Sequence, residues 1–168
     1  VHAEPHPYLP YAWQISGFDY LGGLESFRSG EFSVQDISSM LVGETADPQT
    51  NDYVIDVCAA PGGKSIHVAE KLGGSGHVEA RDLTPYKVGM IEENIERTGL
   101  LNIEAVCQDA LVYDEGSREK ADIVIADLPC SGLGVLGKKT DLKYKATKQG
   151  AAELAQMQRE MLDVVCRY

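Results

Sequence analysis

The sequence predicts an α/β fold in which a mostly parallel sheet is flanked by helices. Strand patterns and helical patterns alternate along most of the chain, which is typical of parallel strands joined by right-handed crossovers. The predicted strands are short runs rich in Val and Ile, as buried parallel strands are. Three of them are followed by an aspartate: Asp82, Asp109 and Asp127. Because the carboxyl ends of parallel strands line the ligand crevice of such a sheet, we expect these carboxylates to converge.

Two segments are expected, an N-terminal extension at residues 1–34 and a core at residues 35–168. The extension is aromatic and punctuated by Gly and Pro, which indicates a hairpin or an irregular cover. The core begins with a predicted helix over residues 35–46, which Pro48 ends. Three apolar residues of this helix are expected to pack on the sheet: Ile37, Met40 and Leu41.

A glycine-rich turn follows the first strand of the core. The apolar residues within 53–57 predict that strand, and Gly62 and Gly63 follow it. Glycine lets the backbone turn tightly and approach a ligand without a Cβ in the way. The next helix begins here, and its free N–H groups and positive dipole favour a carboxylate or a phosphate. We therefore expect a nucleotide-like cofactor at this turn.

The same turn has a rival interpretation as the phosphate loop of an NTPase. Gly63, Lys64 and Ser65 match the end of the G-x-x-x-x-G-K-[ST] motif, but Cys58 stands where its first Gly is needed. The apolar run that ends at Asp127 also resembles a strand with a magnesium-binding aspartate. The NTPase interpretation therefore stays open, with the lower weight.

Asp82 favours a cofactor that contains ribose. It closes a second predicted strand at residues 78–81 and lies 19 residues after Gly63. An acidic side chain binds a ribose hydroxyl pair at an offset of about 20 in dinucleotide folds, and a phosphate loop needs no such carboxylate. Thr84 and Pro85 already supply the cap and the first-turn residue of the next helix, so Asp82 is not needed for capping.

The rest of the core continues the alternation. A helix after Asp82 ends at a predicted Gly99 cap, and strands are expected at residues 102–107 and 121–127. A final amphipathic helix begins near Gln149 and carries Leu154, Met157, Met161 and Val165. The glycine turn and the three carboxylates together predict a binding site for a cofactor that has a ribose, an amine-bearing base and a charged tail. S-adenosylmethionine (SAM) has all three.

Residues 127–131 suggest what the methyl group is for. Carbon 5 of cytosine is a poor nucleophile unless a thiolate adds at carbon 6 and an acid assists at ring nitrogen 3. Asp127 and Cys130, beside a methyl donor, fit that chemistry. A lone Cys is often just a small buried residue, but the end of a strand is an unusual place for that role.

The charge distribution marks one segment for an anion. The chain has a net charge of −11, yet residues 138–148 carry five lysines against one aspartate. A solvated lysine-rich loop is the commoner explanation, but this segment directly follows residues 127–131. The residues expected to bind such an anion are Lys138, Lys139, Lys143, Tyr144 and Lys145, with the tyrosine stacking on a base, and the family resemblance given below implies that this partner is RNA.

The composition is that of a globular protein with a substantial core. The 168 residues are 43% hydrophobic and 24% charged. No apolar run approaches the roughly 20 residues of a membrane span, and no signal-peptide pattern is present. The four cysteines form no C-x-x-C pair, so neither a zinc site nor a disulfide framework is expected. A reduced, cytoplasmic setting is expected.

Several motifs together resemble the Sun (Fmu) family of RNA cytosine-C5 methyltransferases, which includes bacterial small-subunit rRNA enzymes. The resemblance covers about residues 32–165, and its two most specific motifs are CAAPGGK and DLPCSG. The others are FSVQDISS, RDLTPYKV, QDA and ELAQMQREML. It implies a Rossmann-like class I SAM-dependent methyltransferase fold and transfer of a methyl group to carbon 5 of cytosine in RNA, with 16S rRNA as the expected substrate.

The resemblance also implies roles for individual residues. Asp82 would hold the ribose and Asp109 the adenine, while Asp127 would lie between the cofactor and the target base. Lys64 stays open between a cofactor contact and a structural role at the helix start. The methionine end of SAM would be held by Cys58, Ala59, Ala60, Pro61, Gly62, Gly63 and Lys64.

The resemblance implies that the attacking thiol comes from a Thr-Cys motif on a later strand, and that the cysteine matched by Cys130 helps to release the product. We therefore expect a truncated core that lacks its last strands and the principal nucleophile, binds SAM and turns over little. Its open sheet edge predicts self-association. Two alternatives remain: a DNA-type cytosine methyltransferase that uses Cys130 as its nucleophile, and a non-catalytic cofactor-binding module.

Overall fold

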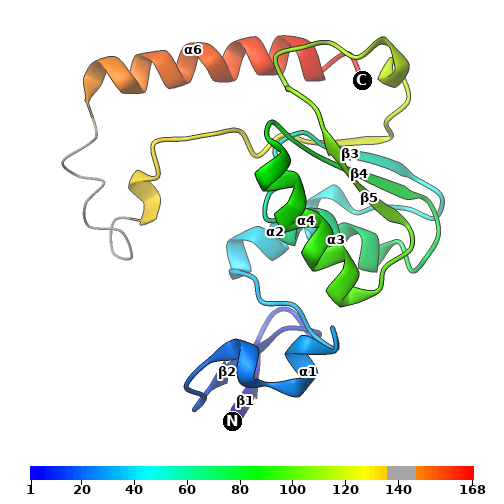
Figure 1. Ribbon diagram of the computed structural model, residues 1–168, viewed down its shortest axis with the longest axis vertical. Coiled ribbons are helices and arrows are strands. Elements are labelled where there is room, and N and C mark those ends of the chain that lie inside the picture. The colour runs from blue at the N-terminus through cyan, green and yellow to red at the C-terminus, as the bar shows by residue number, and fades with distance from the viewer. Residues whose placement is uncertain (136–146) are drawn as a thin grey trace. The chain divides into compact units, whose positions relative to one another are not determined.

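The computed structural model describes residues 1–135 and 147–168 of the chain (Figure 1). The five residues expected to bind RNA, at positions 138–145, lie outside the described residues. The chain divides into two compact units, Val1–Ser33 and Val34–Tyr168. No helix among the described residues combines the length and apolarity needed to cross a membrane.

The first unit is built on a hairpin. Strands β1 (His2–Pro5) and β2 (Trp13–Ser16) pair antiparallel, with His2 opposite Ser16. Two short helical turns follow, η1 (Leu21–Gly23) and α1 (Glu25–Arg28). The hairpin expected in this segment is therefore present, but its first strand lies upstream of the aromatic residues that suggested it.

The second unit contains a parallel four-stranded sheet in the order β5-β4-β3-β6. This confirms the predicted α/β fold. The strands are β3 (Tyr53–Asp56), β4 (His77–Asp82), β5 (Ile103–Cys107) and β6 (Ile123–Ile125). The prediction of a strand over residues 121–127 was too long. Asp56 pairs with Ile125 at the end of β3, and beyond it the chain turns away, so β6 has no partner for Asp127.

Helices lie on both faces of this sheet (Figure 1). One face is covered by α3 (Gly63–Lys71) and α4 (Pro85–Thr98), with α2 (Ile37–Ala46) packed beside α3. The other is covered by the end of α6 (Lys148–Val165). Two further turns, η2 (Glu115–Ser117) and η3 (Leu133–Val135), complete the described elements. Neighbouring residues of β3 serve both cores, because Val54 packs on the α3 and α4 side and Ile55 on the α6 side.

The caps of α4 and α6 follow from local sequence. The Thr84 hydroxyl accepts a hydrogen bond from the Lys87 N–H at the start of α4, and Pro85 occupies the first turn. Gly99 ends α4 in the left-handed conformation and donates to the Ile95 carbonyl. Thr147 caps α6 in the same way, accepting from the Gly150 N–H at 3.0 Å.

The predicted packing of α2 was wrong in detail. Ile37 and Leu41 are substantially exposed, and Val42 is the α2 residue that packs against the core. Gly43 lies directly against the His67 ring of α3, so a side chain at this position would clash with it. The close approach of the two helices at Gly43 sets the rotation of α2 and leaves Leu41 in a groove along β6.

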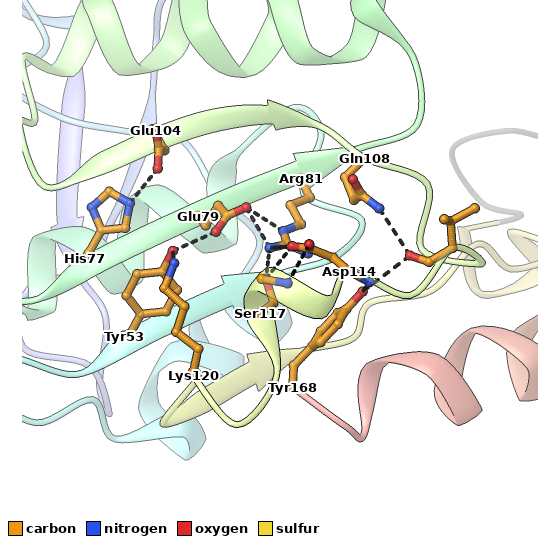
Figure 2. A network of polar contacts seen from close by, with 12 residues as sticks. Tyr53, His77, Glu79, Arg81, Glu104, Gln108, Asp114, Ser117, Lys120 and Tyr168 are labelled. Carbon is orange, nitrogen blue, oxygen red and sulfur yellow. Dashed lines mark hydrogen bonds and ion pairs between the residues drawn. The ribbon is translucent and has the colours of Figure 1, made fainter.

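A buried polar network joins β3 and β4 to the chain after α6 (Figure 2). Arg81, only 2% exposed, donates to Glu79 at 2.7 Å and also contacts Asp114 and Ser117. Glu79 also accepts from the Tyr53 hydroxyl, and the Arg81 guanidinium lies over the Tyr168 ring. The Ser117 hydroxyl bond is the main reason that the pKa of Asp114 is lowered. The network fixes the loop after β5 onto the sheet.

Candidate cofactor site at the carboxyl edge of the sheet

The strand order sets out the predicted cofactor residues along one sheet edge. Asp109 follows β5, Asp82 ends β4, the glycine turn follows β3, and Asp127 follows β6. The glycine turn therefore lies between Asp82 on one side and Asp127 on the other. Both of these carboxylates are bonded to the turn.

Asp82 is bound to the turn directly. Its side chain is buried, and Oδ2 accepts a hydrogen bond from the Ala60 N–H at 3.0 Å. Oδ1 accepts from the Leu83 N–H at 2.8 Å and from the Lys87 ammonium at 3.0 Å. Lys87 was not among the predicted site residues. Its position one turn into the helix that follows Asp82 was the signal available in the sequence.

The turn itself needs glycine at one of its two positions. Gly62 has φ of +103°, where other residues are strained, and an added Cβ would lie 3.3 Å from the Ile91 side chain. Gly63 needs no such conformation, and its nearest neighbour would be Gln35 at 3.9 Å. A Cβ at Gly63 would therefore meet no close neighbour, and there is free space beside the start of α3 at this position.

Asp127 is bound to the turn through Lys64. The Lys64 Nζ lies 2.7 Å from Asp127 Oδ2, and the two side chains are 22% and 58% exposed. The role of Lys64, left open by the sequence, therefore includes an ion pair that joins the first turn of α3 to the chain after β6. The partly exposed pair leaves room for solvent or a ligand next to Asp127.

A third carboxylate lies beneath the turn. Asp56 is 1% exposed and accepts from the Ser65 hydroxyl at 2.7 Å and from the Cys58 N–H at 3.4 Å. Burial raises the pKa of Asp56 to about 6, although the bonds from Ser65 and Cys58 and the Lys64 charge lower it. Sequence reasoning missed this pair, and the signal was a carboxylate at the end of a buried apolar strand.

Two other predicted cofactor residues, Cys58 and Asp109, are less closely bound to the turn than Asp82 and Asp127 are. Cys58 is half-buried, and burial, followed by the charges of Asp82 and Asp56, raises the pKa of its thiol to about 11. This thiol is therefore protonated at neutral pH and unsuited to nucleophilic attack. Asp109 is half-buried after β5, and its Oδ1 accepts from the Leu111 N–H within its own loop.

Cys130 lies at a cavity of about 660 Å³ between the chain after β6 and the first half of α6. The thiol-bearing residue is exposed, and the preceding carbonyl, of Pro129, accepts from the Gln158 side chain at 2.8 Å. Within residues 1–135 and 147–168, no group of His, Cys, Asp and Glu side chains is arranged to hold a metal ion. The cavity is lined by Cys130, Ser131, Leu133, Thr147, Lys148, Gly150, Ala151, Glu153, Leu154 and Met157.

Comparison with known proteins identifies the family of the chain. Residues 44–168 match the family model described as 16S rRNA methyltransferase RsmB/F. The chain belongs to this family. The matched region contains the glycine turn, Asp82, Asp109, Asp127 and Cys130.

Named relatives agree with the family model. The chain is 43% identical over 143 residues to the probable ribosomal RNA small subunit methyltransferase B of Bacillus subtilis, covering 84% of this chain and 32% of the relative. It is 30% identical over 165 residues to ribosomal RNA small subunit methyltransferase B of Yersinia pseudotuberculosis, covering 98% and 38%. The chain thus spans about a third of the length of these relatives.

Two solved structures share the fold of this chain. The structure of PH0851 matches with a TM-score of 0.92 and 28% identity over 99% of this chain and 38% of that one. NSun6 from Pyrococcus horikoshii, solved with SFG, matches with a TM-score of 0.74 and 30% identity over 88% of this chain and 37% of that one. These likenesses confirm the Rossmann-like class I methyltransferase fold.

Proposed function

We propose that this chain is the cofactor-binding part of an RNA cytosine-C5 methyltransferase that acts on 16S rRNA. The observation that carries the proposal is the double attachment of the glycine turn, to Asp82 through Ala60 and to Asp127 through Lys64. The turn thereby presents two carboxylates and a helix N-terminus to one ligand. Membership of the RsmB/F family supports the same chemistry.

The residues present fit SAM. The buried Asp82 carboxylate accepts three N–H donors, which fix its orientation. It can accept the ribose hydroxyl pair if Lys87 moves away from Oδ1, or if Lys87 and the ribose both bond this oxygen. Asp109 would bind the adenine, and the open space at Gly63 and the N-terminus of α3 would receive the methionine end. When bound, SAM would supply an electrophilic methyl group at this edge of the sheet.

Two residues are proposed to act on the base. Asp127 would donate to ring nitrogen 3 of cytosine when protonated and so favour addition of a thiolate at carbon 6. Cys130, exposed at the cavity, would assist release of the product. The same exposure favours a second candidate, a DNA-type enzyme in which Cys130 is the nucleophile. Methylation of DNA that Cys130→Ala abolishes would support this second candidate.

Calorimetric titration of the chain tests the proposal. SAM should bind, and ATP with magnesium should not, while the reverse result would favour the NTPase. Asp82→Ala should weaken SAM binding by about 1 to 3 kcal/mol, because it removes a buried acceptor. Asp163→Ala, on the exposed part of α6, is the matched control and should leave the affinity unchanged. Equal affinity of both variants would refute the placement of the ribose.

RNA and a second copy of the chain are the proposed partners, and the cytoplasm is the proposed location. RNA binding through Lys138, Lys139, Lys143, Tyr144 and Lys145 should weaken with salt, and replacing Lys143 and Lys145 should reduce that salt slope. An unchanged slope would indicate that the lysine-rich segment is a solvated loop that does not bind RNA. β6 ends the described sheet, so its open edge supports self-association. Sedimentation of a monomer at high concentration would contradict it.

A further inference from the structure

The segment at residues 127–131 carries the proposed chemistry but belongs to no helix or strand. Within the described part of the chain, two polar contacts attach it to the rest of the fold. The first is the ion pair of Asp127 with Lys64. The second is the hydrogen bond that Gln158 Nε2 donates to the Pro129 carbonyl, at 2.8 Å. Pro129 has no N–H, so it cannot add a backbone donor bond of its own.

Gln158 lies on a well-anchored part of α6. Met161 and Val165, on the following turns, are 6% and 2% exposed and pack into the core beneath β3. The preceding residue, Met157, lines the cavity opposite Cys130. The amide of Gln158 therefore connects a helix fixed in the core to the carbonyl directly before the exposed thiol. This bond sets the spacing between the two walls of the cavity.

We propose that Gln158 is a positioning residue, which holds the Pro129–Cys130 turn against α6 and so fixes the Cys130 thiol at the wall of a pocket for a pyrimidine base. The proposal rests on the proposed function for the identity of the base. The opposite wall includes Leu154 and Met157, whose apolar side chains suit the flat face of a nucleobase. Chemistry at a base tolerates little misplacement, because an error of about 1 Å costs rate heavily.

The test compares thiol alkylation in the full chain and its variants. Gln158→Leu removes the amide donor and keeps a side chain of similar volume, and Gln156→Leu is the matched control. Gln156 lies on the same helix, is exposed, and among the described residues its side chain bonds Glu160 and Arg159, both on α6. Iodoacetamide labelling, followed by peptide mass spectrometry, gives the rate at Cys130 relative to the exposed Cys107 and Cys166 of the same molecule.

Gln158→Leu should raise the relative rate at Cys130 by about threefold or more, because the freed turn exposes the thiol in more conformations. Gln156→Leu should leave it unchanged. Gln158→Glu serves if the Leu variant fails to fold, since its carboxylate cannot donate at pH 7.5 and should raise the rate likewise. An unchanged or lower relative rate at Cys130 in a folded Gln158 variant would overturn the proposal.

A SAM titration of the same samples separates this inference from the function on which it rests. Gln158→Leu should bind SAM like the unaltered chain, because the glycine turn is untouched. If neither protein binds SAM, the proposed function fails, whatever the labelling shows. If both bind SAM and Cys130 reacts alike in both, only the role of Gln158 is refuted.

Discussion

Asp56→Asn should change how the stability of the chain depends on pH, because Asp56 is a buried carboxylate with a raised pKa. Asn fits the site, since its Oδ1 accepts from the Cys58 N–H and its Nδ2 donates to the Ser65 hydroxyl, in place of the bonds seen for Asp56. Burial raises the pKa of Asp56 from 3.8 to about 6. A folded-state pKa above the unfolded value means that the folded protein holds this proton more tightly.

The stabilisation from this proton is therefore fully present below about pH 4 and is lost as the pH rises through about 6. A shift of about two pKa units corresponds to roughly 3 kcal/mol. Urea unfolding at steps from about pH 4 to 8 measures the effect. Relative to Asp56→Asn, the unaltered chain should lose about 3 kcal/mol of unfolding free energy across that range. Parallel stability curves for the two proteins would refute the reasoning, and Asp163→Asn, exposed on α6, serves as the control.

Two further substitutions test the fold. Gly76→Ala should destabilise the chain by clearly more than the roughly 1 kcal/mol expected for Gly74→Ala. Both glycines have positive φ, but only at Gly76 would a Cβ strike backbone, at Asp52 and Asn51, so equal losses in urea unfolding would contradict the predicted clash. Arg81→Met should cost about 3 to 5 kcal/mol, because it leaves Glu79 buried without its cation. Exposed Arg159→Met is its control, and a loss as small as that of the control would show that the network in Figure 2 is not a stabilising unit.

Local features of the sequence were the most predictable. The Thr84 cap, Pro85 and the Gly99 cap depend on residues within one helix turn, and the structure has all three as expected. The parallel sheet and the placement of Asp82 at the end of β4 follow from alternation and from the apolar strand pattern. Such features need no knowledge of distant partners.

Features that depend on distant partners were not predictable. Ile37 and Leu41 fit a helical apolar pattern, but the contact of Gly43 with His67 decides which face of α2 is buried. The Gln158–Pro129 bond joins residues 29 apart in sequence, and nothing in either local pattern signals it. The Lys64–Asp127 ion pair likewise depends on how β3 and β6 pair.

The electrostatics of the site predict how SAM binding should respond to pH. Asp82 and Asp127 each pair with a lysine, whereas Asp56 lies beneath the turn and titrates near pH 6. A sulfonium cation close to the turn favours the ionised form of Asp56. SAM affinity should therefore rise as the pH increases through about 6, and it should do so less in Asp56→Asn.

S-adenosylhomocysteine provides the matched comparison because it lacks the sulfonium charge. Its affinity, measured by calorimetry over the same range, should change less with pH than that of SAM. If both ligands show the same pH dependence, the proton on Asp56 responds to burial of the site and not to the cofactor's charge. The sulfonium would then lie elsewhere than beside the turn, and the placement proposed for the methionine end would be refuted.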